Sequence, residues 1–264
     1  MHTEKVIDYI VNWLKDYAEN SKMEGFVIGI SGGIDSAVTS TLCAKTGLPT
    51  LCVEMPIHQA ENQVNRAKEH INKLRDKYPN VQQENIDLTS VFEEFKNQAP
   101  IPTNNSLLDL SLANTRARLR MTSLYYFAGL YRYLVAGTGN KVEDFGVGFF
   151  TKYGDGGVDI SPIADLLKSE VYLLGKKLDI TQSILVAAPT DGLFGDDRTD
   201  EDQIGASYDE LEWAIKMKDQ EFTSYDFKNR EKTVFELYSR LHKINQHKIN
   251  PIPVCNIPQK LKTN

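Results

Sequence analysis

The chain has 264 residues, of which 41% are hydrophobic and 25% are charged. This composition is typical of a soluble globular protein with a substantial core, and no apolar run approaches the ~18 residues that a membrane-spanning helix needs. Acidic residues outnumber Lys and Arg by 36 to 30, which is a formal net charge of −6. Because nucleic-acid binding usually requires a basic surface, we expect neither a nucleic acid nor a membrane as a partner.

The compartment is predicted from the N-terminus and the cysteines. Charged residues interrupt the first apolar stretch, residues 1–14, so that it does not resemble a signal peptide. Cys43, Cys52 and Cys255 lie far apart, and none belongs to a CxxC pair. We therefore expect a cytoplasmic protein with three buried, reduced thiols.

Helical and strand periods alternate along the first half of the chain. Apolar residues at helical spacing predict helices around 6–17, from the glycine-rich turn to about 47, around 64–74 and at 107–133. Apolar or alternating runs predict strands at 26–30, 50–53, 81–88 and 133–136. This alternation favours an α/β fold, a doubly wound three-layer sandwich with a mainly parallel sheet.

The second half of the chain is predicted to be a glycine- and aspartate-rich loop followed by helices. Apolar spacing indicates helices at about 165–178, 208–215 and 234–241. We find no internal repeat and no linker, so residues 1–264 are expected to form a single domain.

The segment Ser31-Gly-Gly-Ile-Asp-Ser36 lies between the first predicted strand and the following helix. Paired glycines allow close backbone approach to a ligand, and the N–H groups of the turn and helix start form an anion site. The segment matches neither the Walker A loop nor the dinucleotide fingerprint. A tight turn with Asp35 at the helix N-terminus is the alternative. The string resembles the pyrophosphatase loop of the N-type ATP pyrophosphatase superfamily.

Two further segments carry charge near predicted strand and helix ends. Asn114 and Arg118 share one face of the long predicted helix, and the arginines nearby can bind anions or be solvated. Asn140 and Glu143 follow a predicted strand and fit a helix cap with its N3 carboxylate. Because ligands bind at strand carboxyl ends, Glu143 could instead meet Asp35 and complete a Mg²⁺ shell with phosphate oxygens and water.

The segment Phe149-Phe-Thr-Lys-Tyr-Gly-Asp-Gly-Gly-Val-Asp-Ile160 combines glycines with aromatic residues. By itself it could be an ordinary Ω-loop. With the Ser31–Ser36 loop, it resembles the NAD⁺ synthetase family over residues 6–253. The family's fold is an α/β sandwich, and the resemblance implies ATP and Mg²⁺ as co-substrate and cofactor.

The resemblance also implies roles for particular residues. ATP would be bound by Ser31, Gly32, Gly33, Ile34, Asp35, Ser36, Thr138, Lys168 and Thr190. Deamido-NAD⁺ would be bound by Arg118, Lys152, Asp159, His247 and Lys248, with His242-Lys243 as a second His-Lys pair near the C-terminus. Asp35 and Glu143 would hold Mg²⁺, and Asp35 and Lys168 would act in catalysis.

The implied reaction is ATP-dependent amidation of deamido-NAD⁺ with ammonia, through an adenylated carboxylate, to give NAD⁺, AMP and pyrophosphate. Too few residues precede the first strand for a glutaminase domain, so free ammonia is the expected nitrogen source. The family resemblance further implies a homodimer, and a mobile lid at 188–202.

Two alternatives are compatible with the loop alone. One is another ATP pyrophosphatase, such as a tRNA-modifying thiolase or lysidine synthetase, which the absence of paired cysteines and of a basic extension disfavours. The other is a non-catalytic nucleotide-binding module like those of electron-transfer flavoproteins. Retention of Asp35, Glu143 and Lys168 argues against the second alternative.

Overall fold

A computed structural model describes residues 1–100, 106–190 and 199–262. Its sheet has four parallel strands in the order β3-β2-β1-β4. The strands are β1 (Gly25–Gly29), β2 (Thr50–Glu54), β3 (Val81–Asn85) and β4 (Tyr133–Val135). Val27 in β1 pairs with Leu51 on one side and with Val135 on the other, so β1 lies inside the sheet. The carboxyl ends of these strands meet at one edge, where the chain turns toward the site described below.

The helices that precede β4 in the chain and pack near the sheet are α1 (Thr3–Asn20), α2 (Ile34–Lys45), α3 (Glu61–Lys77), α4 (Thr89–Gln98) and α5 (Leu108–Tyr131). The later ones are the π-helical turn η1 (Lys141–Val147), α6 (Lys168–Lys177), α7 (Gln182–Leu185), α8 (Asp200–Ile204), α9 (Tyr208–Asp219), η2 (Ser224–Asp226), α10 (Asn229–Ile244), α11 (Gln246–Ile249) and η3 (Gln259–Leu261).

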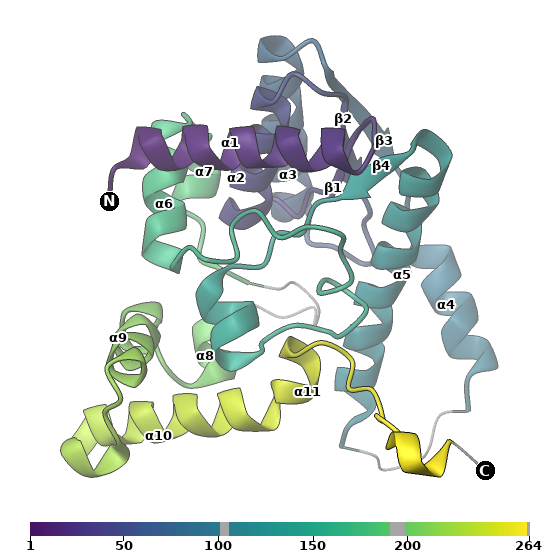
Figure 1. The fold of residues 1–264 in the computed structure, drawn as a ribbon. Coiled ribbons are helices and arrows are strands. Elements are labelled where there is room, and N and C mark those ends of the chain that lie inside the picture. Colours follow the sequence, from purple (N-terminus) through teal and green to yellow (C-terminus); the bar gives the residue numbers. More distant parts are fainter. Residues whose placement is uncertain (101–105, 191–198, 263–264) are drawn as a thin grey trace.

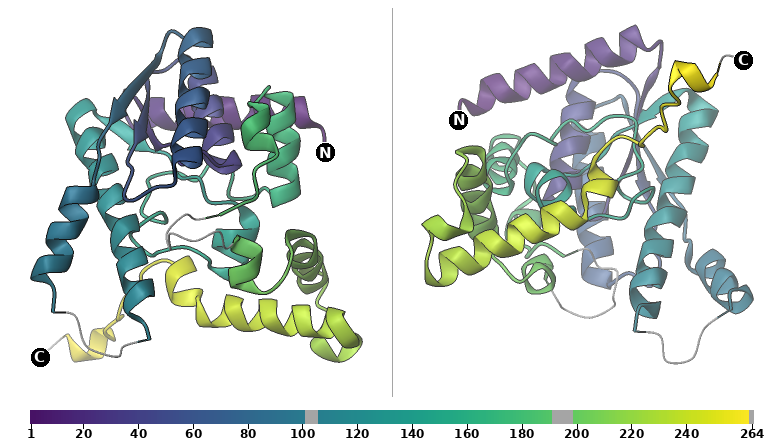
Figure 2. Two further views of the ribbon diagram at one scale, coloured as in Figure 1. Left: turned by 180° about the vertical axis from the view of Figure 1, so that it is seen from behind. Right: turned by 60° about the horizontal axis from the view of Figure 1, so that its bottom comes forward.

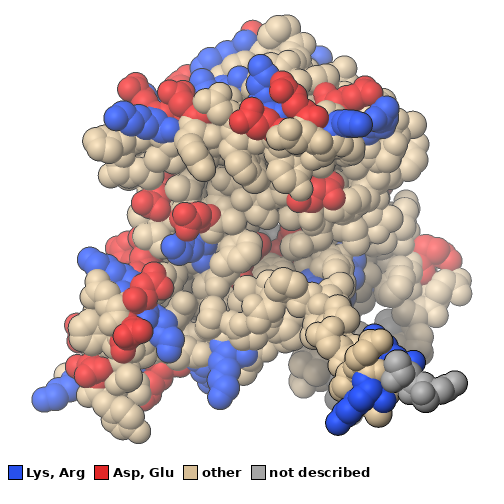
Figure 3. Space-filling model, viewed as in Figure 1, with Lys and Arg blue, Asp and Glu red and all other residues tan. Residues whose placement is uncertain are grey.

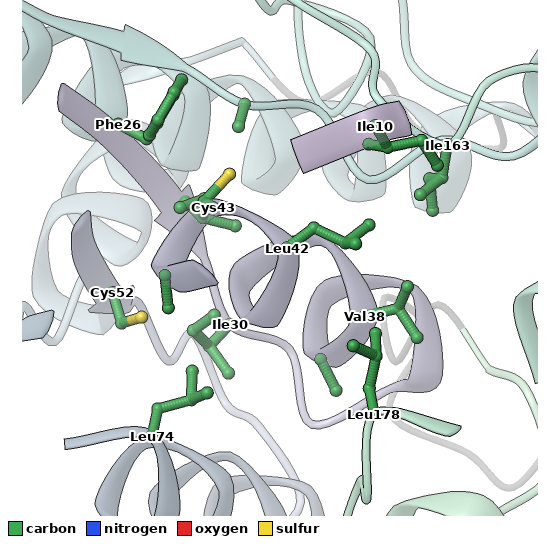
Figure 4. Packing of buried hydrophobic residues seen from close by; sticks show 14 of the residues in the cluster. Ile10, Phe26, Ile30, Val38, Leu42, Cys43, Cys52, Leu74, Ile163 and Leu178 are labelled. Atoms are coloured by element: carbon green, nitrogen blue, oxygen red, sulfur yellow. The ribbon is translucent and has the colours of Figure 1, made fainter. Parts of the chain in front are cut away.

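Alternating strand residues send their side chains to two separate cores, one on each face of the sheet. Phe26 and Ile28 join a cluster with α1, α2, α3 and α6, which Figure 4 shows from close by. Val27 joins a second cluster with α4 and α5, where Phe92 is fully buried. Strands with both faces covered in this way are typical of parallel sheets. The predicted three-layer α/β sandwich is confirmed (Figures 1 and 2).

Several predicted boundaries differ from the observed ones. The strand expected at 81–88 ends at Asn85, and the helix expected at 107–133 ends at Tyr131. Arg132 ends that helix because its backbone is left-handed, with φ of 58°. The helix expected from 165 begins only at Lys168. Helix α4 was not predicted, because its single buried residue, Phe92, leaves little apolar periodicity to detect.

A third apolar cluster lies away from the sheet, between η1, α9 and α10. Its members include Leu211 and Val234, and the helices predicted at 208–215 and 234–241 are confirmed as parts of α9 and α10. Figure 1 shows these two helices side by side at the lower left. They hold the chain that flanks η1 against the edge of the sheet where the strands end. The division into one domain stays a prediction.

Other expectations concerned the burial of the cysteines, the charge of the surface and membrane-spanning helices. Cys43 and Cys52 are buried, but the expectation for Cys255 is wrong, because it is exposed, like the other described residues after α11 (250–262). Acidic and basic side chains are interspersed over α1 on the face shown in Figure 3. Among the helices of the described ranges, none has the length and apolar character to cross a membrane.

Candidate active site

The glycine loop joins the end of β1 to the start of α2. Gly32 has φ of +82°, a left-handed conformation that favours glycine. A Cβ at Gly32 would lie 2.5 Å from the Gln63 carbonyl oxygen, so α3 also requires glycine here. Inside the turn, the Ser36 hydroxyl donates to the Gly33 carbonyl at 3.1 Å and accepts from the Ser31 amide at 3.3 Å. These contacts hold the loop open in front of the helix N-terminus, the arrangement that suits an anion.

Three charged side chains meet beside this loop. The Lys168 ammonium donates to Asp35 Oδ2 and to Glu143 Oε1, both at 2.7 Å. The three residues come from different elements: Asp35 is in α2, Glu143 in η1 and Lys168 at the start of α6. Lys168 is only 3% exposed. We call Asp35, Glu143 and Lys168 the buried ion cluster. The structure thus brings together the two predicted metal ligands and the predicted catalytic lysine.

Neighbouring polar groups fix the orientation of both carboxylates. Asn140, which is fully buried, donates from Nδ2 to Asp35 Oδ1 at 3.1 Å. The Asn140 side-chain oxygen accepts from the amides of Val142 and Glu143, which confirms Asn140 as the helix cap, while the Glu143 carboxylate bonds Lys168 and Tyr208. The Tyr208 hydroxyl lies 2.5 Å from Glu143 Oε1 and 3.2 Å from Asp200 Oδ2. The cap and the carboxylate role predicted for this segment are therefore compatible.

The protonation of the cluster follows from burial and charge. Burial raises the pKa of Asp35, although the Lys168 ammonium opposes this. Burial acts in the same direction on Glu143, but the Lys168 ammonium and the hydrogen bonds from Lys168 and Tyr208 lower the Glu143 pKa. Burial alone would lower the pKa of Lys168, yet the two carboxylates hold it well above its usual range. With both carboxylates ionised, the cluster carries a net charge of −1.

The donors at this point suit a hard divalent cation. Two carboxylates converge on one ammonium at equal distances, so their oxygens already face a common positive charge. In the described part of the chain, no group of three or more His, Cys, Asp or Glu side chains could hold a metal. Two carboxylates alone match Mg²⁺, which usually keeps waters and binds substrate phosphates as well.

A cavity of about 280 Å³ opens beside the cluster. All the residues predicted to bind ATP border it: Ser31, Gly32, Gly33, Ile34, Asp35, Ser36, Thr138, Lys168 and Thr190. Glu143 also borders it, and so do residues that the sequence analysis did not assign: Glu54, Gln59, Arg66, Arg120 and Asp200. The predicted ATP residues are thus gathered around one space, although they come from segments far apart in the chain.

Four of the predicted dinucleotide-binding residues gather elsewhere, and we call them the basic cluster: Arg118, Lys152, His247 and Lys248. Arg118 Nε donates to the Lys152 carbonyl at 3.3 Å, and the Lys152 ammonium donates to the His247 carbonyl. Lys248 donates to the Phe150 carbonyl at 2.7 Å. Burial lowers the pKa of Lys248, and the nearby carboxylates of Asp155 and Asp144 act in the opposite direction. Both carboxylates border the cavity. None of the four borders the cavity itself.

Asp159 lies apart from the basic cluster in its contacts. Its Oδ2 accepts from the Val135 amide of β4 at 2.8 Å, and its Oδ1 accepts from the Tyr125 hydroxyl at 3.0 Å. These bonds tie the loop after residue 149 to the sheet and to α5. The alternative His-Lys pair is also used internally, since His242 Nδ1 lies 2.7 Å from the Gly146 carbonyl oxygen. His247 is exposed, so the preference for His247 and Lys248 stays a reasonable prediction.

Some residues of the site left little trace in the sequence. Tyr208 fits the apolar stripe of α9, so its spacing indicated core packing, and its hydroxyl contacts depend on tertiary structure. Arg66 is one of many charged residues on α3, where nothing in the spacing marks it. Arg120 was visible as a member of the arginine run, on the helix face opposite Arg118. The predicted lid at 188–202 lies largely outside the described residues.

These features define a parallel α/β protein with a glycine loop and a buried ion cluster at the carboxyl edge of its sheet. A model of the NAD synthase family matches residues 6–252. The NH(3)-dependent NAD(+) synthetase of Mesoplasma florum is 36% identical over 252 residues, covering 95% of this chain and 96% of that protein. The chain therefore belongs to the NAD synthase family and is a ligase that forms a C–N bond.

Solved structures agree with this assignment. An NMN synthetase from Francisella tularensis superposes with a TM-score of 0.84 and 34% identity, covering 97% of this chain and 100% of that chain. An NH3-dependent NAD synthetase from Campylobacter jejuni, solved with a nitrate ion, has a TM-score of 0.77 and 25% identity at the same coverage. Both span nearly the whole of this chain.

Proposed function

We propose that this enzyme amidates deamido-NAD⁺ with ammonia, in an ATP-dependent reaction that gives NAD⁺, AMP and pyrophosphate. The supporting observation is the meeting of Asp35, Glu143 and Lys168 beside the glycine loop, on the wall of a cavity that all the predicted ATP residues border. The family model and the curated relatives support the coarser part of this proposal, ammonia-dependent NAD⁺ synthesis.

The residues have distinct tasks in this mechanism. The loop amides and the α2 N-terminus hold the phosphates of ATP, and Lys168 balances negative charge as pyrophosphate leaves. Asp35 and Glu143 would hold Mg²⁺, which supplies further charge neutralisation when bound. The basic cluster binds the phosphates of the dinucleotide and so brings its nicotinate carboxylate toward the α-phosphorus. Most of the rate would come from positioning and electrostatics, since no covalent nucleophile is required.

The bond changes follow from the substrates. A carboxylate oxygen of the acid bonds to the α-phosphorus, and the bond to the bridging oxygen breaks, so that pyrophosphate leaves with the electron pair. Ammonia then attacks the acyl carbon of the adenylate. AMP departs with its electron pair, and one proton is released as the amide forms.

A product assay tests this proposal. With deamido-NAD⁺, ATP, MgCl₂ and ammonium chloride, we expect equal amounts of NAD⁺, AMP and pyrophosphate. Without ammonium, exchange of labelled pyrophosphate into ATP should still require deamido-NAD⁺, because the adenylate forms reversibly. Release of ADP, or turnover that depends on tRNA, would exclude this function.

A mononucleotide acid is the second candidate substrate. The NMN synthetase structure shares more identity and a higher TM-score with this chain than the NAD synthetase structure described above does. An enzyme that makes NMN by the same chemistry would amidate nicotinate mononucleotide. Comparing kcat/KM for the mononucleotide and dinucleotide acids decides between them. If kcat/KM is higher for the mononucleotide, nicotinate mononucleotide becomes the proposed substrate in place of the dinucleotide.

The homodimer is part of the same proposal, with the dinucleotide bound near the subunit interface. Exposed aromatic side chains on α5, among them Tyr125 and Tyr126, offer apolar area for such a contact. Sedimentation at several protein concentrations tests it. A species of monomer mass at micromolar concentration would reject the dimer.

A further inference from the structure

Arg66 connects α3 to the glycine loop. Its Nε donates to the Gly32 carbonyl at 3.2 Å. The two backbones come together closely, since a Cβ added to Gly32 would lie 2.5 Å from the Gln63 carbonyl oxygen and 3.4 Å from Arg66 Cβ. Helix α3 therefore packs closely against the loop, and the hydrogen bond ties the Arg66 guanidinium to it.

The remaining nitrogens of this guanidinium are available to a ligand. Arg66 borders the cavity and is half-buried, and neither of its terminal nitrogens has a partner among the described residues. Lys168 and Arg120 are the other Lys or Arg side chains of the described ranges on the cavity wall. Lys168 is bonded to two carboxylates, and Arg120 donates to the Met55 carbonyl and to Gln59.

The charge around the loop also calls for a further cation. A triphosphate brings several negative charges to the glycine loop, and Lys168 cannot neutralise them alone because it already pairs with two carboxylates. A guanidinium presents two parallel N–H donors that match a phosphate group, and such charge-assisted pairs are stronger than neutral ones. Because Nε is bonded to the loop carbonyl, the two terminal nitrogens are held near the loop and can donate to a ligand there.

We propose that Arg66 binds the terminal phosphates of ATP and stabilises pyrophosphate as it leaves. This inference rests on the proposed function, in which the bond between the α-phosphorus and the bridging oxygen breaks. Arg66 then acts as a contact to the leaving group, alongside Lys168, and accompanies the charge that develops on pyrophosphate.

The direct test is binding of inorganic pyrophosphate with MgCl₂, measured by calorimetry. The variants are Arg66→Gln, Arg66→Lys and, as a matched control, Lys68→Gln, which removes an exposed charge from the same helix. We expect Arg66→Gln to weaken pyrophosphate binding at least tenfold, which corresponds to about 1.4 kcal/mol. Arg66→Lys should retain part of the affinity because it keeps the positive charge but loses the paired N–H donors of the guanidinium. Lys68→Gln should bind pyrophosphate like the wild type.

Steady-state kinetics supplies a readout that a structural role would not move. We expect Arg66→Gln to lower kcat/KM for ATP by about 10- to 100-fold, while KM for ammonia stays unchanged. A thermal unfolding transition near that of the wild type confirms that Arg66→Gln folds. If Arg66→Gln does not fold, the same kinetic comparison is made with Arg66→Lys. Equal pyrophosphate affinity in wild type and Arg66→Gln overturns the role of Arg66 alone. A wild-type protein that binds neither ATP nor pyrophosphate overturns the proposed function itself.

Discussion

The buried ion cluster and the basic cluster differ in how their charges are partnered. In the buried ion cluster, Lys168 is 3% exposed and both of its 2.7 Å contacts are to carboxylates. In the basic cluster, Arg118 and Lys152 donate to backbone carbonyls, so their charges stay without a counter-ion in these contacts. The first arrangement is part of the folded structure, and the second leaves charge for a ligand. Loss of a residue should therefore affect folding in the first and substrate affinity in the second.

Lys168→Ala should have the largest effect of the variants considered. It leaves two enclosed carboxylates without their counter-ion, and breaking a buried pair in this way typically costs about 3–5 kcal/mol. Urea unfolding measures the loss, and turnover should fall with it. Lys141→Ala is the control, because its 3.2 Å pair with Asp165 has side chains 36% and 97% exposed. Its effect should stay below about 1 kcal/mol. Equal losses in the two variants would contradict the comparison.

Asp35→Asn and Glu143→Gln keep the shape of the cluster but remove one carboxylate each. If both bind metal, turnover should fall by roughly 10²–10³-fold or more, about 3–4 kcal/mol, because developing charge is no longer stabilised. Mn²⁺ binding in the presence of an ATP analogue, followed by electron paramagnetic resonance, should weaken as well. Asp165→Asn, an exposed carboxylate, is the control. A variant with near-normal turnover and Mn²⁺ affinity would lose its assignment as a metal ligand.

His70 extends the comparison to a buried group that lacks a counter-ion. Burial lowers its pKa from 6.5 to about 4, and its Nε2 lies 2.9 Å from the Ser40 hydroxyl oxygen. Below pH 6.5 the unfolded chain binds a proton that the folded chain does not. Stability is therefore complete above pH 6.5 and falls toward pH 4, by about 3 kcal/mol from this group.

Chemical unfolding at a series of pH values measures that contribution. His70→Gln should have lower stability at neutral pH but a shallower loss between pH 6.5 and 4. His2→Gln, an exposed histidine, should follow the wild-type profile. Parallel profiles for His70→Gln and the wild type would show that His70 binds its proton equally in both states.

Lys152→Ala probes the basic cluster and should have the smallest effect. We expect KM for deamido-NAD⁺ to rise about tenfold, or ~1.4 kcal/mol, with unfolding unchanged within about 0.5 kcal/mol. The difference should shrink at high salt, because an exposed charge is screened. Lys176→Ala, at an exposed position on α6, should leave KM unchanged. A large loss of stability in Lys152→Ala would mean that this cluster is structural after all.

The features of the site that residue patterns alone predicted are mostly local ones, whereas Thr138, Lys168 and Thr190 were assigned through the family resemblance. The loop from Ser31 to Ser36 follows a strand directly, and the Asn140 cap needs only the amides two and three positions ahead. Arg66 and Tyr208 could not be found in this way. Their contacts reach Gly32 and Glu143, residues that the chain brings near them only by folding.

The same distinction between local sequence and tertiary structure applies to the fold and to the buried ion cluster. The alternation of helical and strand periods predicted a parallel α/β fold. Strands β1 and β2 are mainly apolar because both of their faces are buried, whereas the edge strand β3 is largely polar. The bond from the Val135 amide to Asp159, which ties the loop after residue 149 to β4, was visible only in the tertiary structure. The sequence by itself determined most of the elements, the loop and the chemical character of the site, whereas helix α4 was found only in the structure. The sequence also predicted that Glu143 lies near Asp35, but only the tertiary structure decided that Lys168 lies between them, because α2, η1 and α6 come from distant segments and enclose it.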